Sequence, residues 1–358
     1  MSPDAPAACR NLLEPPAFAG LFVRYPPQDF ACRIDSLGVP VFSTSFDLLT
    51  TLEPRVRRCL IRIPLFSAWS KLLRLRTCCA GTTLTEYAPL PQNLSPTAVI
   101  DNLLAEHAGS HTLTALKDLP DCSPLLPEED NGFADALAAL AADRGFIQVE
   151  GQALAYVPID FADSGEYLGR LSPVRRKDVR RKLKKRFVLE VERVRLGDAR
   201  FADPIFLDEL YAMYLAVFTQ SETQFDLLSR EFFAALLQHR EIEGVVFLYR
   251  HGERLAGYNI CLIQNNMLID KYVGFTYPLA REMNLYCISW VENLEFALEH
   301  GLHTYIAGWT DPLVKASLGA SFTFTRHLVW VHNPLLRRIL RPLRRFFESD
   351  GQMVRGAA

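Results

Sequence analysis

The chain has 358 residues, 49% of them hydrophobic and 11% aromatic, which is enough apolar material for one or two full hydrophobic cores. Its 39 basic and 41 acidic residues leave a formal net charge of -2, so no field of the whole protein would hold duplex DNA. Any site for anions must therefore be local.

The termini and motifs exclude several classes of protein. The N-terminus, MSPDAPAACR, lacks the basic and apolar parts of a secretory signal, and no window reaches the roughly 18 apolar residues of a membrane span. The sequence contains no C-x-x-C pair, no H-E-x-x-H, no P-loop and no G-x-G-x-x-G motif. We therefore expect a cytoplasmic protein with reduced cysteines and without a metal site or dinucleotide chemistry.

The first elements predict a mixed α/β region with proline-rich breaks. VPVFSTSFDLL (39–49) and HTLTALKDLP (111–120) are typical of strands. TAVIDNLLAEHA (97–108) and NGFADALAALAADRG (131–145) are typical of helices, which we expect to end near Gly109 and Gly145. Residues 54–77, which follow the first strand, are apolar and basic together.

A helix is predicted to begin at Ser172, where an N-cap residue is followed by proline. Nine Lys or Arg residues lie between Val174 and Arg186, with only Asp178 to neutralise them. An external polyanion would lower this repulsion, and the candidates are a nucleotide-linked substrate, a tRNA acceptor stem or lipid head groups. The expected contacts are arginines, namely Arg175, Arg176, Arg180 and Arg181. The alternative is a solvated helix face that only links two domains.

The elements that follow are more sharply defined. We expect a strand (187–196), two amphipathic helices (204–218 and 229–239), and an antiparallel meander of three strands whose turns lie at His251-Gly252 and Asn265-Asn266. A long helix (284–301), a strand (302–309), a short segment (311–320) and a last strand (322–332) complete the pattern.

This order of elements is that of the GNAT acyltransferase fold. The phrases EYLGRLSPVRRKDVRRKLKKR and LEFALEHGLHTYIAGWTDPLVKASLGA resemble tandem-GNAT proteins related to the Fem-type aminoacyltransferases, in which a lysine precedes a glycine as Lys315 precedes Gly319 here. The resemblance covers roughly residues 80–332. It implies an α+β fold with two tandem GNAT-like domains, each a mostly antiparallel sheet flanked by helices. We expect a degenerate domain (1–162), a transferase domain (163–333) and a basic amphipathic tail (334–358).

The resemblance also implies where a donor would bind. Most GNAT enzymes hold the pyrophosphate of coenzyme A on a loop of the form Q/R-x-x-G-x-G/A, but the equivalent loop here, FTYPLAREMNLY, has no glycine. A helix N-terminus at Asn284, with Arg281 beside it, could still hold an anion. Better-known members of the Fem-like branch take an aminoacyl group from tRNA.

Candidate catalytic residues lie on the third meander strand. Period-two alternation places Asp270 and Tyr272 on one face, where they could act as base and acid in acyl transfer. The alternative is that Asp270 is ion-paired and that Tyr272 packs in the core.

The segment after the next strand contributes Trp309, Asp311 and Lys315, at the point where a GNAT sheet opens to substrate. Lys315 could bind phosphate or stabilise negative charge on the acyl carbonyl oxygen. A surface lysine beside a turn is the alternative.

Three functions remain open. The leading hypothesis is transfer of an acyl group from acyl-CoA or an acyl-carrier protein to an amine. The rivals are Fem-like transfer from aminoacyl-tRNA and a non-catalytic GNAT-fold module that binds a phosphate-bearing ligand. The donor, the acceptor and the oligomeric state do not follow from the sequence.

Peripheral attachment to an anionic inner-membrane surface is a further hypothesis. In PLLRRILRPLRRFF (334–347), leucines, isoleucine and phenylalanines recur at helical spacing among arginines. Residues 54–77 add further basic residues around apolar ones: Arg55, Arg57, Arg58, Arg62, Lys71, Arg74 and Arg76. The alternative, favoured by the helix-breaking Pro342, is a helix docked on the protein's own core.

Overall fold

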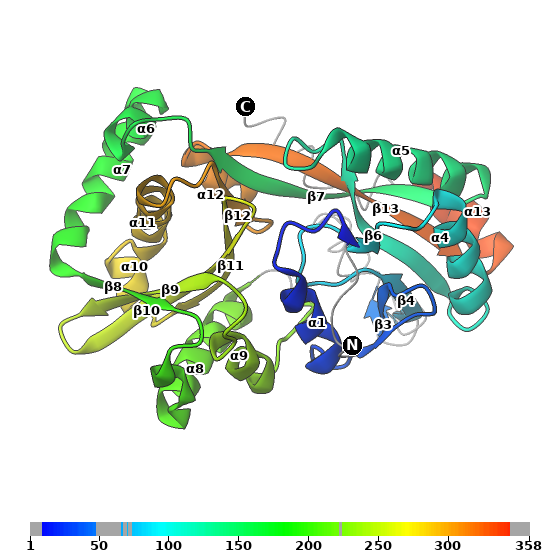
Figure 1. Cartoon of the computed structure of the whole chain (residues 1–358), viewed down its shortest axis with the longest axis horizontal. Coiled ribbons are helices and arrows are strands. Elements are labelled where there is room, and N and C mark those ends of the chain that lie inside the picture. The colour runs from blue at the N-terminus through cyan, green and yellow to red at the C-terminus, as the bar shows by residue number, and fades with distance from the viewer. Residues whose placement is uncertain (1–8, 48–65, 67–69, 71–73, 222–223, 344–358) are drawn as a thin grey trace. The chain divides into compact units, whose positions relative to one another are not determined.

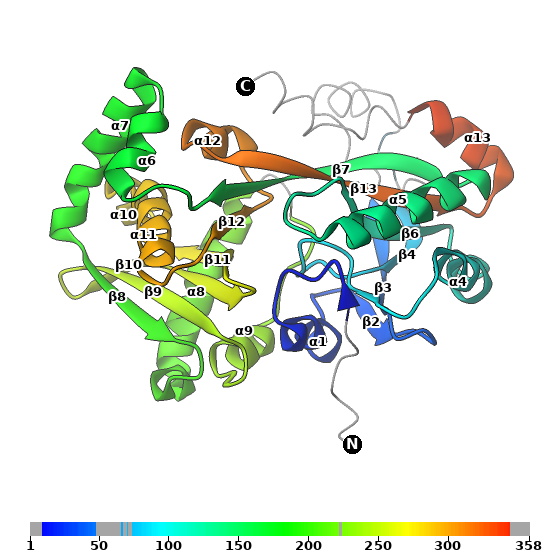
Figure 2. The same ribbon diagram turned by 45° about the horizontal axis from the view of Figure 1, so that its top comes forward.

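The structure, a computed structural model, describes residues 9–47, 66, 70, 74–221 and 224–343. The chain forms two compact units (Figures 1 and 2). Unit 1 is made of residues 1–153 and 323–358, and unit 2 is residues 154–322. The domain boundaries at 162/163 and 333/334 stay a prediction. The mixed class with mostly antiparallel pairing and flanking helices is confirmed.

Unit 1 has a sheet in the order β2-β3-β4-β6-β13-β7. The strands of this sheet are β2 (Ala31–Ile34), β3 (Pro40–Asp47), β4 (Arg74–Ala80), β6 (Leu113–Asp121), the first part of β7 (Ile147–Pro158) and most of β13 (Ser321–Val331). Strands β1 (Cys9–Arg10) and β5 (Leu90–Pro91) pair with each other in a separate sheet. Its helices are α1 (Pro16–Arg24), α4 (Pro96–Asn102), η3 (Leu103–His107), α5 (Glu128–Asp143) and α13 (Pro334–Leu343). The strands and helices predicted for 39–145 are confirmed.

Unit 2 has a sheet in the order β7-β12-β11-β10-β9-β8. Its strands are the end of β7, β8 (Glu190–Arg195), β9 (Gly244–His251), β10 (Arg254–Gln264), β11 (Met267–Phe275) and β12 (Thr304–Gly308). Its helices are α6 (Ser164–Arg170), α7 (Pro173–Leu183), η4 (Lys184–Val188), η5 (Ala199–Ala202), α8 (Pro204–Gln220), α9 (Arg230–Leu237), α10 (Leu279–Glu282), α11 (Leu285–Glu299) and α12 (Pro312–Ser317). Helices α8 and α11 lie on opposite faces of this sheet (Figure 1).

Short-range signals of the sequence produce the predicted local structure in unit 2. The hydroxyl of Ser172 accepts a hydrogen bond from the backbone N–H of Arg175, which caps α7. Asn265 and Asn266 have φ values of 50° and 56°, the left-handed conformation that a tight hairpin between β10 and β11 requires. The predicted meander of β9, β10 and β11 is therefore confirmed.

A β-bulge interrupts the pairing of β10 with β11. Ile260 lies opposite Tyr272 and Cys261 lies opposite Asp270, so Lys271 is an extra residue on β11. An extra residue reverses the alternation of side chains beyond it. Asp270 and Tyr272 therefore point to opposite faces of the sheet, and the prediction that they share a face is wrong.

The C-terminal helix α13 packs on the core of unit 1. Leu336 and Leu340 contact a small buried cluster of Leu113, Ile147 and Val331. The expectation of a helix docked on the protein's own core is thus confirmed for this face of α13. None of the helices in the described part of the chain has the length and apolar character needed to cross a bilayer. Of the basic residues predicted within 54–77, only Arg74 and Arg76 lie among the described residues, on β4.

Candidate functional site

A small pocket opens in unit 2 where β11 and β12 separate. The parallel pairing of these strands ends at Ile269 opposite Ile306, and Asp270 is the next residue on β11. The pocket has a volume of about 80 Å³. Its lining comes from β11, α11, β12 and α12, namely Asp270, Lys271, Val273, Tyr286, Ser289, Trp290, Tyr305, Ala307, Thr310 and Lys315. Two of the predicted catalytic residues, Asp270 and Lys315, therefore meet here.

Hydrogen bonds from buried neighbours hold the carboxylate of Asp270. Oδ2 accepts from the hydroxyl of Tyr305 at 3.0 Å and from Nδ2 of Asn293 at 3.0 Å. Oδ1 lies 3.4 Å from Nδ2 of Asn259, on β10. Asn259 and Asn293 are joined by a 3.0 Å bond, and Tyr249 donates to Oδ1 of Asn259 at 2.7 Å. The thiol of Cys261 is a further hydrogen-bond partner of this carboxylate, so four buried side chains fix its orientation.

The environment moves the pKa of Asp270 toward neutrality. Burial raises the pKa of this carboxyl to about 6, against the opposing influence of the hydrogen bond from Tyr305, the charge of Lys315 and the amide of Asn259. A group with a pKa near the working pH can both accept and return a proton. Asp270 is therefore suited to general base chemistry.

Lys315 is carried into the pocket by the short helix α12. Asp311 precedes the helix in the left-handed conformation, with φ of 53°, and Pro312 occupies its first position. The side chain of Lys315 is only 3% exposed. Gly308, with φ of 78°, lies beside it: a β-carbon at Gly308 would be 3.9 Å from Nζ of Lys315 and 3.6 Å from the backbone oxygen of Asp270. The alternative, that Lys315 is a surface lysine, is therefore wrong.

Tyr272 does not belong to this pocket. Its ring packs edge-on against Phe232 at 5.8 Å between centroids and tilted against Phe233 at 5.5 Å, both on α9. It also contacts Tyr214 of α8 at 6.5 Å. The phenol therefore lies among the helices on the face opposite Asp270, where it cannot exchange a proton with a group that Asp270 activates.

The connection between β11 and α11 differs from an open anion-binding loop. The backbone N–H groups of Ala280, Arg281, Glu282, Met283 and Asn284 all donate to backbone carbonyls of residues 276–281, in and around α10. The side chain of Arg281 reaches Gln220 and lies over the ring of Tyr277 at 4.8 Å. These amides are therefore already used within the protein.

The predicted arginines of α7 divide into engaged and exposed groups. Arg175 donates to the carbonyl of Ala316, directly after Lys315, at 3.2 Å, and Arg176 donates to Gly169 at 3.2 Å. Arg181 and Lys182 share Asp178. Arg180 is exposed. Among the described residues no carboxylate forms an ion pair with Arg175 or Arg176, so the first turns of α7 bring positive charge to α12.

Trp309 and Asp311 lie in the segment that leads from β12 into α12. Trp309 is half-buried and Asp311 is exposed, and Thr310 between them lines the pocket.

Sequence patterns also miss the residues that hold Asp270. Asn259, Asn293 and Tyr305 are 0%, 0% and 1% exposed and come from β10, α11 and β12. The available signal is the polar asparagine inside the otherwise apolar runs GYNICLI and WVENLEF. A polar side chain in such a run must find buried partners.

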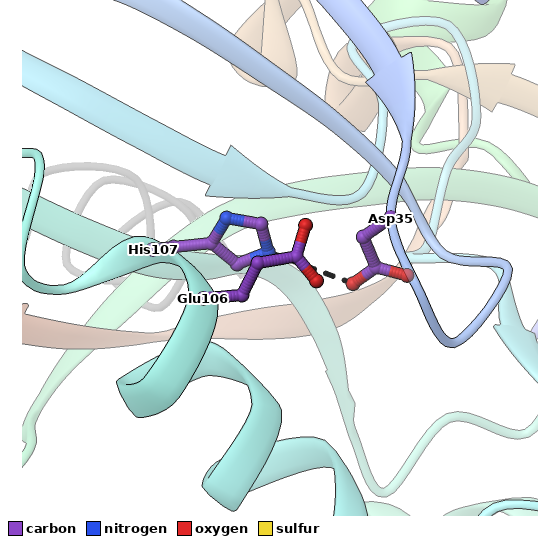
Figure 3. A group of neighbouring side chains, drawn as sticks. All are labelled: Asp35, Glu106 and His107. Atoms are coloured by element: carbon purple, nitrogen blue, oxygen red, sulfur yellow. Dashed lines mark ion pairs between the residues drawn. The ribbon is translucent and has the colours of Figure 1, made fainter.

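Unit 1 contains a cluster of potential metal ligands, Asp35, Glu106 and His107 (Figure 3). Nε2 of His107 lies 3.6 Å from Oδ2 of Asp35, while Nη1 of Arg33 donates to Glu106 at 2.6 Å. The neighbouring carboxylate of Asp35 raises the pKa of His107 to about 9, and hydrogen bonds from Ser36 and Arg33 lower that of Glu106 to about 2. Arg33 pairs with Glu106 and His107 pairs with Asp35, so we interpret this group as an ion-pair cluster.

The histidine in this cluster also starts an H-x-x-x-H spacing with His111. The ring of His111 lies 3.0 Å from Ser43 and 2.9 Å from Ser110, so it is engaged with serine hydroxyls.

Comparisons with known proteins agree with the fold. Residues 174–312 match the model of the acetyltransferase (GNAT) domain. The C-terminal domain of a protein named as a lysylphosphatidylglycerol synthetase, from Agrobacterium fabrum, superposes with a TM-score of 0.54 at 11% identity, covering 87% of this chain and 86% of that chain. L-PGS from Bacillus licheniformis gives 0.54 at 10% identity, covering 94% and 98%. FemX gives 0.50 at 13% identity, covering 91% and 98%. No curated protein matches the sequence.

Proposed function

We propose that this chain, in which residues 174–312 match a GNAT domain and whose fold is similar to that of FemX, is an acyltransferase that transfers an aminoacyl group from an ester on tRNA to an amine. The observation that carries the choice of donor is the connection between β11 and α11. Coenzyme A needs free backbone N–H groups there for its pyrophosphate, whereas Ala280 to Asn284 donate theirs to backbone carbonyls of residues 276–281. A tRNA ester needs no such cradle.

The small size of the pocket supports a donor of which only the reacting group enters the pocket. Its volume of about 80 Å³ is far below the roughly 300–1,000 Å³ of pockets that enclose whole ligands. The reacting carbonyl group and the acceptor nitrogen enter it, while the rest of the donor lies outside. The unneutralised arginines at the start of α7, of which Arg175 contacts α12, are suited to the phosphates of the acceptor stem.

The groups in the pocket fit aminolysis of an ester. The acceptor nitrogen attacks the carbonyl carbon, and Asp270 takes the proton that this nitrogen loses. Negative charge develops on the carbonyl oxygen, and Lys315, which is buried beside Asp270, stabilises it. The carbon–oxygen bond to the ribose then breaks, and Asp270 returns its proton to the leaving ribose oxygen. The amide product forms and the base is regenerated.

The test offers the full-length chain each donor class in turn. Acyl-CoAs, acyl-carrier proteins and charged tRNAs are each incubated with a metabolite extract that supplies acceptors, and loss of the acyl group is followed by mass spectrometry. We expect deacylation of charged tRNA alone, at a rate that Asp270→Asn lowers by about 10² or more. Deacylation of a CoA or carrier-protein thioester, or of no donor at all, would refute the proposal. The last result would favour a non-catalytic binding module.

A further inference from the structure

The two faces of helix α13 (Pro334–Leu343) have different surroundings. The inner face packs on unit 1 through Leu336 and Leu340. Arg337 fixes this face: its Nε and Nη2 donate to the carbonyl of Val331 at 2.9 and 2.7 Å, and its guanidinium lies 3.6 Å from the centre of the Trp330 ring. The orientation of α13 on unit 1 is thereby set.

The outer face carries apolar side chains in solvent. Leu335 is 73% exposed and Ile339, one helical turn later, is 59% exposed. Arg338, directly before Ile339, and Arg341 are also exposed. Since the helix PLLRRILRPL contains no acidic residue, the charges of these arginines are not balanced within α13.

We propose that this outer face of α13 is a docking surface for an anionic membrane. Charge complementarity decides the occupant. A second copy of the chain would bring its own Arg338 and Arg341 against those of the first, and like charges repel. An anionic bilayer instead offers lipid phosphates to the arginines and an apolar layer to Leu335 and Ile339. The inference does not depend on the proposed donor, because α13 contributes nothing to the pocket at Asp270.

Flotation of the full-length protein with vesicles tests the proposal. One vesicle contains equal parts of phosphatidylcholine and phosphatidylglycerol, and the other contains phosphatidylcholine alone. We expect flotation with the anionic vesicle only, and release as salt rises. Arg338→Gln with Arg341→Gln should weaken binding by about fivefold per arginine. Leu335→Ser with Ile339→Ser should weaken it at least as much, since exposed apolar side chains supply the insertion.

A control variant separates α13 from the other basic surface. Replacement of Arg175, Arg176, Arg180 and Arg181 by Gln changes α7 in unit 2 and should leave flotation unchanged. Failure of the wild type to float at low salt overturns the proposal, as does loss of flotation only in the α7 variant. A concentration-dependent dimer in light scattering that Leu335→Ser with Ile339→Ser abolishes would show that a second copy covers this face. Donor deacylation by the α13 variants should stay at the wild-type rate, so the two proposals fail separately.

Discussion

Asn293 donates a hydrogen bond from Nδ2 to Oδ2 of Asp270 over 3.0 Å, and it does so from the middle of a helix whose neighbouring residues are buried. The same amide accepts from Asn259 through its oxygen. An amide held at both ends cannot turn away when Asp270 gains or loses a proton. The geometry of the base is therefore set by helix α11 and strand β10 together.

Asp270→Asn should lower turnover by about 10² or more, because an amide cannot accept the proton of the acceptor. The pKa of Asp270, near 6, sets the sign of the pH dependence. The ionised form is the base, so the wild-type rate should rise with pH through about 6 and level off above it. This rising limb of the pH profile should be missing from the residual rate of the variant. Near-normal turnover of Asp270→Asn would contradict the assignment.

Asn293→Leu should move this limb to higher pH, because removing a donor to the ionised carboxylate raises its pKa further. We expect a stability loss of roughly 1–3 kcal/mol as well, since Asn259 loses its acceptor. Tyr249→Phe is the matched control: it removes a buried hydrogen bond to Asn259 but none to Asp270. If both variants shift the limb equally, Asn293 does not set the pKa of Asp270.

The same substitution, tyrosine to phenylalanine, should have different effects at positions 305 and 272. Tyr305→Phe removes a donor to Asp270, so the limb should move to higher pH and the rate near neutrality should fall. Tyr272→Phe alters a ring that packs against α9, so turnover should stay near normal. The measurement is the pH profile of donor deacylation. A loss of about 10² in Tyr272→Phe would restore it as the acid.

Lys315→Met should lower turnover by about 10² and weaken donor binding, since it removes the positive charge that stabilises the developing oxyanion. It should also raise the pKa of Asp270, because the charge of Lys315 now lowers it. Single-turnover rates measured across donor concentrations separate the two effects. Lys271→Met, which changes another lysine of the pocket lining, is the control and should have the smaller effect on the single-turnover rate.

Replacing Arg175, Arg176, Arg180 and Arg181 together by Gln should weaken binding of charged tRNA and flatten its salt dependence. Each lost phosphate contact reduces the slope by about 0.7–0.9. Filter binding at a series of salt concentrations measures both. Arg338→Gln with Arg341→Gln is the control in unit 1. An unchanged affinity in the α7 variant would mean that this helix presents only a solvated face.

What could be predicted from the sequence is local in origin. Ser172 caps α7 through an amide three residues away, and the Asn265-Asn266 turn depends on the two residues themselves. Lys315 was found through a resemblance and Asp270 through its place on a strand. By contrast, the partners of Asp270 come from β10, α11 and β12, and nothing in the sequence around Asn259 or Asn293 specifies which polar group each will meet.

The side that Tyr272 faces could not be predicted for a related reason. Period-two alternation assumes an uninterrupted ladder of paired residues. The β-bulge that interrupts it depends on how β11 pairs with β10, so the sequence of β11 alone does not reveal it.

Because Lys271 is an extra residue on β11, the number of residues at this point decides which side chains of the strand face the pocket. Side chains before it and after it keep separate registers, so deletion of this one residue would rejoin them into a single ladder. Either Asp270 or the segment from Tyr272 onward would then have to turn over. Insertions and deletions at this position should therefore be far less tolerated than substitutions.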